Sequence, residues 1–314
     1  MGPADRVRLG RTALEVTRLG LGLAPIGGLY SAVSEEAARA TVERGLRHGL
    51  RLFDTAPLYG HGLSERRAGM ALKARPRSEF VLSTKVGRLL VPGSEGAQPI
   101  WAGLPEGIVP SFDFSYDGVR RSFEESLARL GLERIDILHI HDPDDHFDEA
   151  MSGAFQALSD LRADGIIGAV GAGMNQAEML ARFAREGDFD CFILAGRYTL
   201  LDRSGLDELL PLCGERGIAV IAAGVYQSGL LADPRPGASD NYEPVQMQRL
   251  KRALELQGIC AEFGVPLRAA AVQFPFSHPA ITSVIVGVRS PEEVDDAVAM
   301  MSHPVPDALW ERLK

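Results

Sequence analysis

The strongest constraint on this chain is the regular alternation of short apolar segments with longer amphipathic ones. Eight apolar segments have the length of buried strands, and they begin near residues 19, 51, 80, 135, 166, 191, 218 and 283. Helical periodicity occurs between them: in residues 116–130, for example, Val119, Phe123 and Leu127 recur at every fourth position. Because strands that alternate with helices form parallel sheets, we expect an open α/β sheet or a (β/α)8 barrel.

The same alternation organises the whole chain. No charged or Ser/Pro-rich linker interrupts it, so we assign residues 1–314 to a single domain. Residues 7–17 predict a β-hairpin ahead of the first strand. Residues 86–114 and 232–244 contain many Pro and Gly residues, and we predict long rim loops there, the first a substrate loop without regular structure. Pro291 is expected to begin the last helix.

Composition argues against several classes of protein. The formal net charge is −9 and the chain has no Lys/Arg cluster, so nucleic acid is not an expected partner. Cys191, Cys213 and Cys260 are odd in number and widely spaced, which favours reduced thiols over a disulfide frame or a metal site. The chain has no apolar run of ~18 residues and no signal-peptide pattern. We therefore expect a cytoplasmic protein without a membrane partner, and the oligomeric state stays open.

Three successive strands end in an ionisable residue. Asp54 ends the second strand and Tyr59 lies in the following turn, after which Ser64 is expected to cap a helix. Lys85 and His141 end the next two strands. Because the carboxyl ends of parallel strands meet where α/β folds build their active sites, these side chains predict a site. Taken singly, Asp54 with Lys85 would also suit a structural ion pair, and His141 a core histidine.

The segments that carry these residues resemble those of the aldo-keto reductase family. The matching motifs are Phe53-Asp54-Thr55-Ala56 with Tyr59-Gly60, Ser83-Thr84-Lys85, and His141-Asp142-Pro143. The resemblance extends over essentially the whole chain. It implies a (β/α)8 TIM barrel with long rim loops, closed at the bottom by the N-terminal β-hairpin. More specific motifs, such as Ala24-Pro25-Ile26-Gly27-Gly28, resemble those of the bacterial branch that contains L-fucose, D-threo-aldose and pyridoxal dehydrogenases.

The resemblance implies a catalytic tetrad of Asp54, Tyr59, Lys85 and His141. Tyr59 would be the general acid/base, and a neighbouring ammonium, that of Lys85, would lower the pKa of its hydroxyl. Asp54 would hold Lys85, and His141 would orient and polarise the substrate carbonyl. His139, two residues from His141, is assigned to the opposite face of the strand and given no role.

The resemblance also implies a nicotinamide dinucleotide across the barrel rim, since the chain has neither a strand-linked GxGxxG nor a P-loop motif. NAD is preferred over NADP in this prediction because Glu293 would repel a 2′-phosphate, although Arg289 argues the other way. Gly173-Met174, Ala195 and Ala223 depart from the side chains that the family often has there. The implied cofactor-binding residues are Asn175, Gly224, Tyr226, Ser228, Gly287, Arg289, Ser290, Glu293 and Asp296.

The expected activity is NAD(P)-dependent oxidation of the anomeric carbon of an aldose, of the L-fucose or D-threo-aldose type, to a lactone. Trp101 is a candidate apolar platform for the sugar, and Asp142 a candidate acceptor for a hydroxyl. Pyridoxal 4-dehydrogenation or a broad aldehyde reductase activity is the alternative within the family. Two other classes remain open: a glycoside hydrolase that uses Asp54 and Asp142, and a non-catalytic dinucleotide-binding regulatory subunit. The expected partner is a small-molecule sugar or aldehyde.

Overall fold

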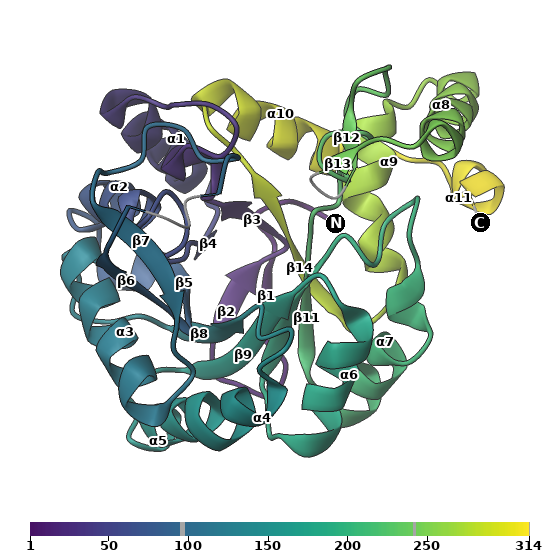
Figure 1. The fold of residues 1–314 in the computed structure, drawn as a ribbon. Coiled ribbons are helices and arrows are strands. Elements are labelled where there is room, and N and C mark those ends of the chain that lie inside the picture. The colour runs from purple at the N-terminus through teal and green to yellow at the C-terminus, as the bar shows by residue number, and fades with distance from the viewer. Residues whose placement is uncertain (95–97, 241–242, 314) are drawn as a thin grey trace.

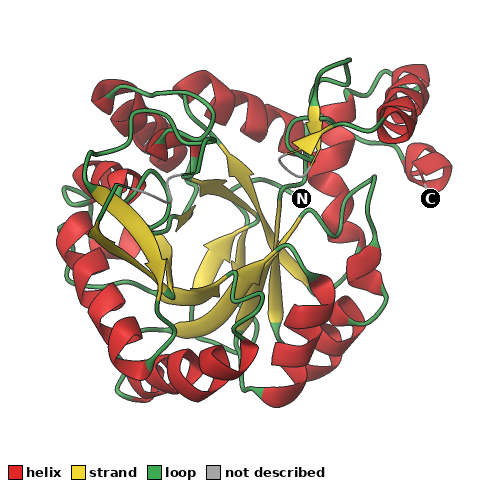
Figure 2. Ribbon diagram, viewed as in Figure 1, coloured by secondary structure: helices red, strands yellow, loops and turns green. Residues whose placement is uncertain are grey.

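The computed structural model describes residues 1–94, 98–240 and 243–313. Eight parallel strands form a closed barrel, and helices surround it (Figures 1 and 2). The strands follow one another around the barrel in chain order, and the last pairs with the first, so the predicted (β/α)8 fold is confirmed. They are β3 (Leu19–Gly22), β4 (Leu52–Asp54), β5 (Val81–Val86), β8 (Ile137–His141), β9 (Ala169–Met174), β10 (Cys191–Ala195), β11 (Ala219–Ala223) and β14 (Ile281–Gly287).

The helices of the outer layer begin and end close to the predicted positions. They are α1 (Glu35–Arg47), α2 (Leu63–Leu72), α3 (Tyr116–Leu130), α4 (Phe147–Glu149), α5 (Phe155–Ala163), α6 (Ala177–Glu186), α7 (Leu209–Arg216), α8 (Met247–Glu262), α9 (Leu267–Gln273), α10 (Pro291–Ser302) and α11 (Asp307–Leu313). A π-helical turn, Ala150–Ala154, joins α4 to α5. Pro291 begins α10, but the prediction that this helix is the last was wrong, because α11 follows it. None of the helices in the described ranges is long and apolar enough to cross a membrane.

The N-terminal hairpin lies at the amino-terminal end of the barrel. Its strands β1 (Arg6–Arg8) and β2 (Glu15–Thr17) pair in antiparallel fashion, as predicted. Leu9 and Val16 are fully buried and belong to the cluster of inward-facing residues that fills the barrel. The hairpin therefore closes the bottom of the barrel with apolar side chains.

The barrel interior also sets the direction of the catalytic candidates. Leu52, Val81 and Ile137 belong to the inward-facing cluster near the start of their strands. Because side chains on a strand alternate between its two faces, residues two or four positions further on face inward as well. Asp54, Lys85 and His141 are at those positions, at the opposite end of the barrel from the hairpin.

Two local predictions were wrong. Residues 86–114 are not without regular structure: β6 (Arg88–Pro92) and β7 (Ile108–Phe112) form an antiparallel hairpin, in which Pro92 and Pro110 are tolerated because a two-stranded ribbon has open edges. Ser64 does not cap α2, since Gly62 is the N-cap residue with φ of 85°. The Ser64 hydroxyl instead lies 2.8 Å from the Leu23 carbonyl oxygen and donates to it, which ties α2 to the loop after β3.

Smaller differences have local causes. β9 begins at Ala169, after the predicted start near 166, because Ile166 and Ile167 still donate to the Leu161 carbonyl at the end of α5. The rim loop at 232–244 includes the short strands β12 (Ser239–Asp240) and β13 (Glu243–Pro244).

Candidate active site

A buried ion pair forms the base of the site. The Lys85 ammonium donates to Asp54 Oδ2 at 2.7 Å and to the Thr55 carbonyl oxygen at 2.9 Å. The Ser83 hydroxyl donates to the second oxygen of Asp54 at 2.8 Å. Although burial favours the neutral amine, the Asp54 carboxylate raises the pKa of Lys85 above its ordinary value. Lys85 is therefore charged and fixed in direction by its neighbours.

Tyr59 lies directly beside Lys85. The Lys85 ammonium is 4.6 Å from the centre of the Tyr59 ring, and the two side chains share a hydrogen bond at the phenolic oxygen. The tight turn that holds Tyr59 requires Gly60, whose φ is +61° and where a Cβ atom would meet the Gly27 carbonyl oxygen at 2.0 Å. Burial raises the pKa of Tyr59 and Lys85 lowers it, with a net rise. The predicted effect of Lys85 is present, but burial outweighs it, so the free site holds a protonated phenol.

His141 stands on the other side of the Tyr59 ring. The two ring centres are 5.8 Å apart and the rings are nearly perpendicular, at 87°. Burial lowers the pKa of His141 well below its ordinary value, and the charges of Arg88 and Lys85 add to this effect. The imidazole is therefore neutral near pH 7, and one ring nitrogen can donate to a substrate oxygen.

His139 was assigned to the wrong face of its strand. Residues two apart on a strand share a face, and the structure places His139 inside the barrel below His141, with its Cα level with that of Lys85. Its ring occupies the space next to Gly171, where a Cβ atom would lie 2.2 Å from Nδ1. Burial lowers the pKa of His139 to about 3, so this imidazole is also neutral.

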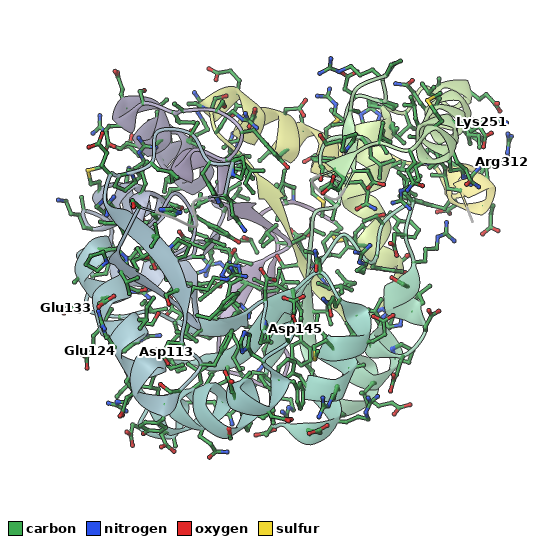
Figure 3. The ribbon with its side chains drawn as sticks, viewed as in Figure 1. Asp113, Glu124, Glu133, Asp145, Lys251 and Arg312 are labelled. Atoms are coloured by element: carbon green, nitrogen blue, oxygen red, sulfur yellow. The ribbon has the colours of Figure 1, made fainter. Side chains whose placement is uncertain are left out.

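Asp142 follows His141 and pairs with a residue that the sequence analysis missed. Arg88, the first residue of β6, donates from Nη2 to Asp142 Oδ2 at 3.3 Å, and the same oxygen is 3.5 Å from His141 Nε2. Burial raises the pKa of Asp142 to about 6, against the effect of Arg88. The other acids of this loop lie differently: Asp144 accepts from Gln176, and Asp145, labelled near the centre of Figure 3, is exposed.

Trp101 forms part of the wall above Tyr59. Its ring centre is 5.8 Å from that of Tyr59, and its exposed fraction is only 9%. Backbone hydrogen bonds from Tyr30 to Ile100 and from Ala102 to Gly28 fasten the Trp101 segment to the loop after β3. The structure thus places this predicted substrate residue against the candidate acid/base.

The other half of the rim carries small residues at the inward positions of its strands. The inward positions that follow Ile193, Ile221 and Ile285 near the carboxyl ends of their strands carry no large side chain, and Ala195 and Ala223 are where the family often has larger residues. The small inward residues of this arc are Gly22, Gly173, Ala195, Ala223 and Gly287. The arc begins next to Asp54, because Gly22 pairs with both Gly287 and Asp54. No bulky side chain therefore occupies this arc, where we expect the nicotinamide ring.

The predicted cofactor residues lie at the ends of the strands that border this arc. Gly224 directly follows β11, and Gly287 ends β14. Asn175 directly follows β9, and its carbonyl oxygen accepts from Arg197 at 2.6 Å. Ser290 is the N-cap of α10 and accepts from the Glu293 backbone amide.

Two of these loops also contact residues that the sequence analysis missed. Ser228 hydrogen-bonds with Tyr30, and Arg289 donates to the Ser31 hydroxyl at 2.9 Å, so the loop after β3 joins the two loops assigned to the cofactor.

Two predicted cofactor residues have protein partners of their own. Asp296 accepts from Arg268 at 3.0 Å. Tyr226 has a buried hydroxyl without a hydrogen-bond partner among the described residues. Burial raises the pKa of Tyr226, and the nearby Asp296 carboxylate adds to this effect. Asp296 is thus held by the protein, whereas the Tyr226 hydroxyl has capacity for a ligand.

The barrel carries a tyrosine, a lysine–carboxylate pair and a neutral histidine on one side of its rim, opposite the arc of small residues. This arrangement defines a class of oxidoreductases that interconvert carbonyls and alcohols with a dinucleotide. Comparison with known proteins agrees: the model of the Aldo/keto reductase family matches residues 18–314, and the chain belongs to this family. It is an NAD(P)-dependent oxidoreductase.

Similar proteins cover nearly the whole chain. It is 42% identical to a pyridoxal 4-dehydrogenase of Microbacterium luteolum, over 99% of this chain and 97% of the relative. It is 41% identical to a D-threo-aldose 1-dehydrogenase of a Pseudomonas species, over 96% and 94% of the two chains. Among solved structures, an aldo-keto reductase of Bacillus halodurans superimposes with a TM-score of 0.80 at 25% identity, over 98% and 95% of the chains.

Proposed function

We propose that this protein oxidises the anomeric carbon of an aldose to a lactone, with NAD as hydride acceptor. The observation that carries the proposal is the placement of Tyr59, the Asp54–Lys85 pair and His141 on one side of the rim, facing the arc of small residues. The similarity to a D-threo-aldose 1-dehydrogenase supports the substrate class. Pyridoxal is the second candidate substrate. The chain is also similar to a pyridoxal 4-dehydrogenase, and an apolar wall at Trp101 suits an aromatic ring.

The roles of the residues follow from their contacts. When bound, the dinucleotide supplies the hydride acceptor. In the oxidation, Tyr59 accepts the proton of the substrate hydroxyl as a phenolate, the form that Lys85 stabilises; in the reverse reduction, the phenol donates that proton. Asp54 keeps Lys85 charged and directed at the phenol. His141, being neutral, donates a hydrogen bond to the same substrate oxygen and holds it in line.

Asp54 is a poor candidate for the glycosidase alternative. Its carboxylate is 3% exposed and is fully engaged by Lys85 and Ser83, so it cannot reach a glycosidic carbon. A non-catalytic subunit would have no need for the Tyr59–Lys85 contact. Turnover of any alcohol or aldehyde would decide against that second alternative.

The test of the substrate class is a panel of free sugars. We expect NADH formation at 340 nm when the protein meets NAD⁺ and L-fucose or D-arabinose, and loss of that activity when Trp101 becomes Ala, because the sugar then loses its apolar platform. Trp310, which packs outside the barrel, offers a matched Trp→Ala control. Oxidation of pyridoxal or reduction of aromatic aldehydes, with no turnover of any aldose, would contradict the aldose assignment and leave the second candidate.

The preference for NAD follows from an ion pair. Glu293 accepts from the Arg289 backbone amide at 2.8 Å and lies 3.3 Å from the Arg289 guanidinium, so the cation that would bind a 2′-phosphate already has a carboxylate partner. We expect kcat/KM to be higher with NAD than with NADP. Glu293→Gln should shift this ratio toward NADP by releasing Arg289. A tenfold preference of the unaltered protein for NADP would reverse the assignment.

A further inference from the structure

Arg88 is a charged side chain within reach of the reacting groups, and the proposed mechanism gives it no role. Gly87, with φ of +96°, turns the chain at the end of β5, two residues after Lys85, and Arg88 is the next residue. The guanidinium stacks over the Phe112 ring, 4.5 Å from its centre, at the base of the β6–β7 hairpin. Its side chain is only 13% exposed. The hairpin thus holds a nearly buried cation beside His141 and Asp142.

The Arg88–Asp142 pair has unused hydrogen-bonding capacity. Asp142 Oδ2 is 3.3 Å from Arg88 Nη2 and 3.5 Å from His141 Nε2, both longer than an ordinary hydrogen bond of about 2.9 Å. Arg88 Nε is buried without a partner among the described residues. Asp142 also has a left-handed backbone, with φ of +41°, which is held by a hydrogen bond to the Gly173 carbonyl. Such strained residues concentrate at functional sites.

We propose that Arg88 and Asp142 together bind the hydroxyl group on the carbon next to the reacting carbon, and so select 2-hydroxy aldoses. This inference rests on the proposed function and names the substrate group that the site recognises. A hydroxyl accepts one hydrogen bond and donates another, and the pair offers a guanidinium donor and a carboxylate acceptor side by side.

Distances within the site favour a hydroxyl on the carbon next to the reacting carbon. If His141 Nε2 bonds the reacting oxygen at about 2.9 Å, the Asp142 oxygen, 3.5 Å from Nε2, lies no more than about 6.4 Å from that oxygen. A hydroxyl on the neighbouring carbon stands between the two, whereas more distant hydroxyls point further along the sugar. Asp142 and His141 would then bind neighbouring oxygens of one substrate. A site that hydrogen-bonds a hydroxyl also rejects an analogue that lacks it, because its own buried polar groups stay unpaired.

The test compares D-arabinose with 2-deoxy-D-ribose, which differs from it only in lacking the hydroxyl on the second carbon. We expect the unaltered protein to prefer D-arabinose by ~10²-fold or more in kcat/KM. In Arg88→Met the preference should fall to less than ~10-fold, and nearly all of the change should be a loss on D-arabinose. Methionine keeps an apolar contact with Phe112, so the hairpin should stay in place.

Further variants separate binding from structure. Asp142→Asn should also reduce the preference, and asparagine tolerates the left-handed backbone that alanine would strain. Arg121→Met, on the exposed face of α3, is the matched control and should leave kcat/KM unchanged for both sugars. An equal loss on both sugars in Arg88→Met would mean that Arg88 only positions His141 or the hairpin, and would overturn the inference. So would an unaltered protein that oxidises both sugars equally well. Failure to oxidise any aldose with either dinucleotide is a different result, and it would overturn the proposed function as well.

Discussion

Replacement of Tyr59 by Phe is expected to reduce kcat for alcohol oxidation by ~10²-fold or more, since general acid–base catalysis of this kind contributes ~10²–10⁴-fold. The change removes one oxygen and leaves the ring, which contacts Trp101, His141 and the Lys85 ammonium. Because the dinucleotide would lie over the arc of small residues and not on the phenol oxygen, its Kd should change little. Steady-state kinetics and a fluorescence titration of the dinucleotide measure the two effects separately.

The chain offers a matched control for this substitution. Tyr198 is also buried, but its hydroxyl pairs with the Ser277 hydroxyl at 2.8 Å, on another part of the barrel. Tyr198→Phe also removes one buried phenolic oxygen, but it should leave kcat unchanged. A folded Tyr59→Phe variant with the turnover of the unaltered protein would refute the acid/base assignment.

Most of the barrel could be predicted from the sequence because its strands and helices obey local rules. Buried parallel strands form continuous apolar runs, and Ser34 and Ser115 cap the helices that follow them. The position of the candidate tetrad at the rim could be predicted because three of its residues stand at the carboxyl ends of such strands. In each case a short stretch of chain contains the whole signal.

The remaining parts depend on contacts between distant segments. The β6–β7 hairpin pairs Arg88 with Phe112, and its Pro residues made the strands resemble a loop. Arg88 has no motif of its own, so only the fold reveals that it approaches Asp142. Tyr30 was hidden for the same reason, because its partner Ser228 is far away in the chain. His139 is different, since strand alternation alone was enough to place it on the same face as His141.

Asp54→Asn should have the largest effect on stability. Asp54 and Lys85 are 3% and 2% exposed, and removing one partner of a buried pair leaves the other as an uncompensated charge. Measured cases of this kind lose ~3–5 kcal/mol. Although burial favours the neutral amine, Asp54 raises the pKa of Lys85 above its ordinary value, so the contribution of the pair is present below pH ~10 and is lost as the pH rises through the folded-state pKa. The loss of stability should therefore be measured near pH 7.

Denaturant unfolding of Asp54→Asn, with the slope m as a check on two-state behaviour, measures the loss directly. Ser83→Ala is the matched comparison, because it removes a hydrogen bond to the same carboxylate but keeps the ion pair, and should lose only ~1 kcal/mol. The asparagine amide has the shape of the carboxylate, and its N–H group can donate to the Ser83 hydroxyl, but it lacks the negative charge that compensates the Lys85 ammonium and holds it in place. Lys85 then no longer holds a fixed direction toward Tyr59, so kcat should fall together with stability. A variant that loses no more stability than Ser83→Ala would show that Lys85 releases its proton when unpaired, and that the charge at Tyr59 does not depend on Asp54.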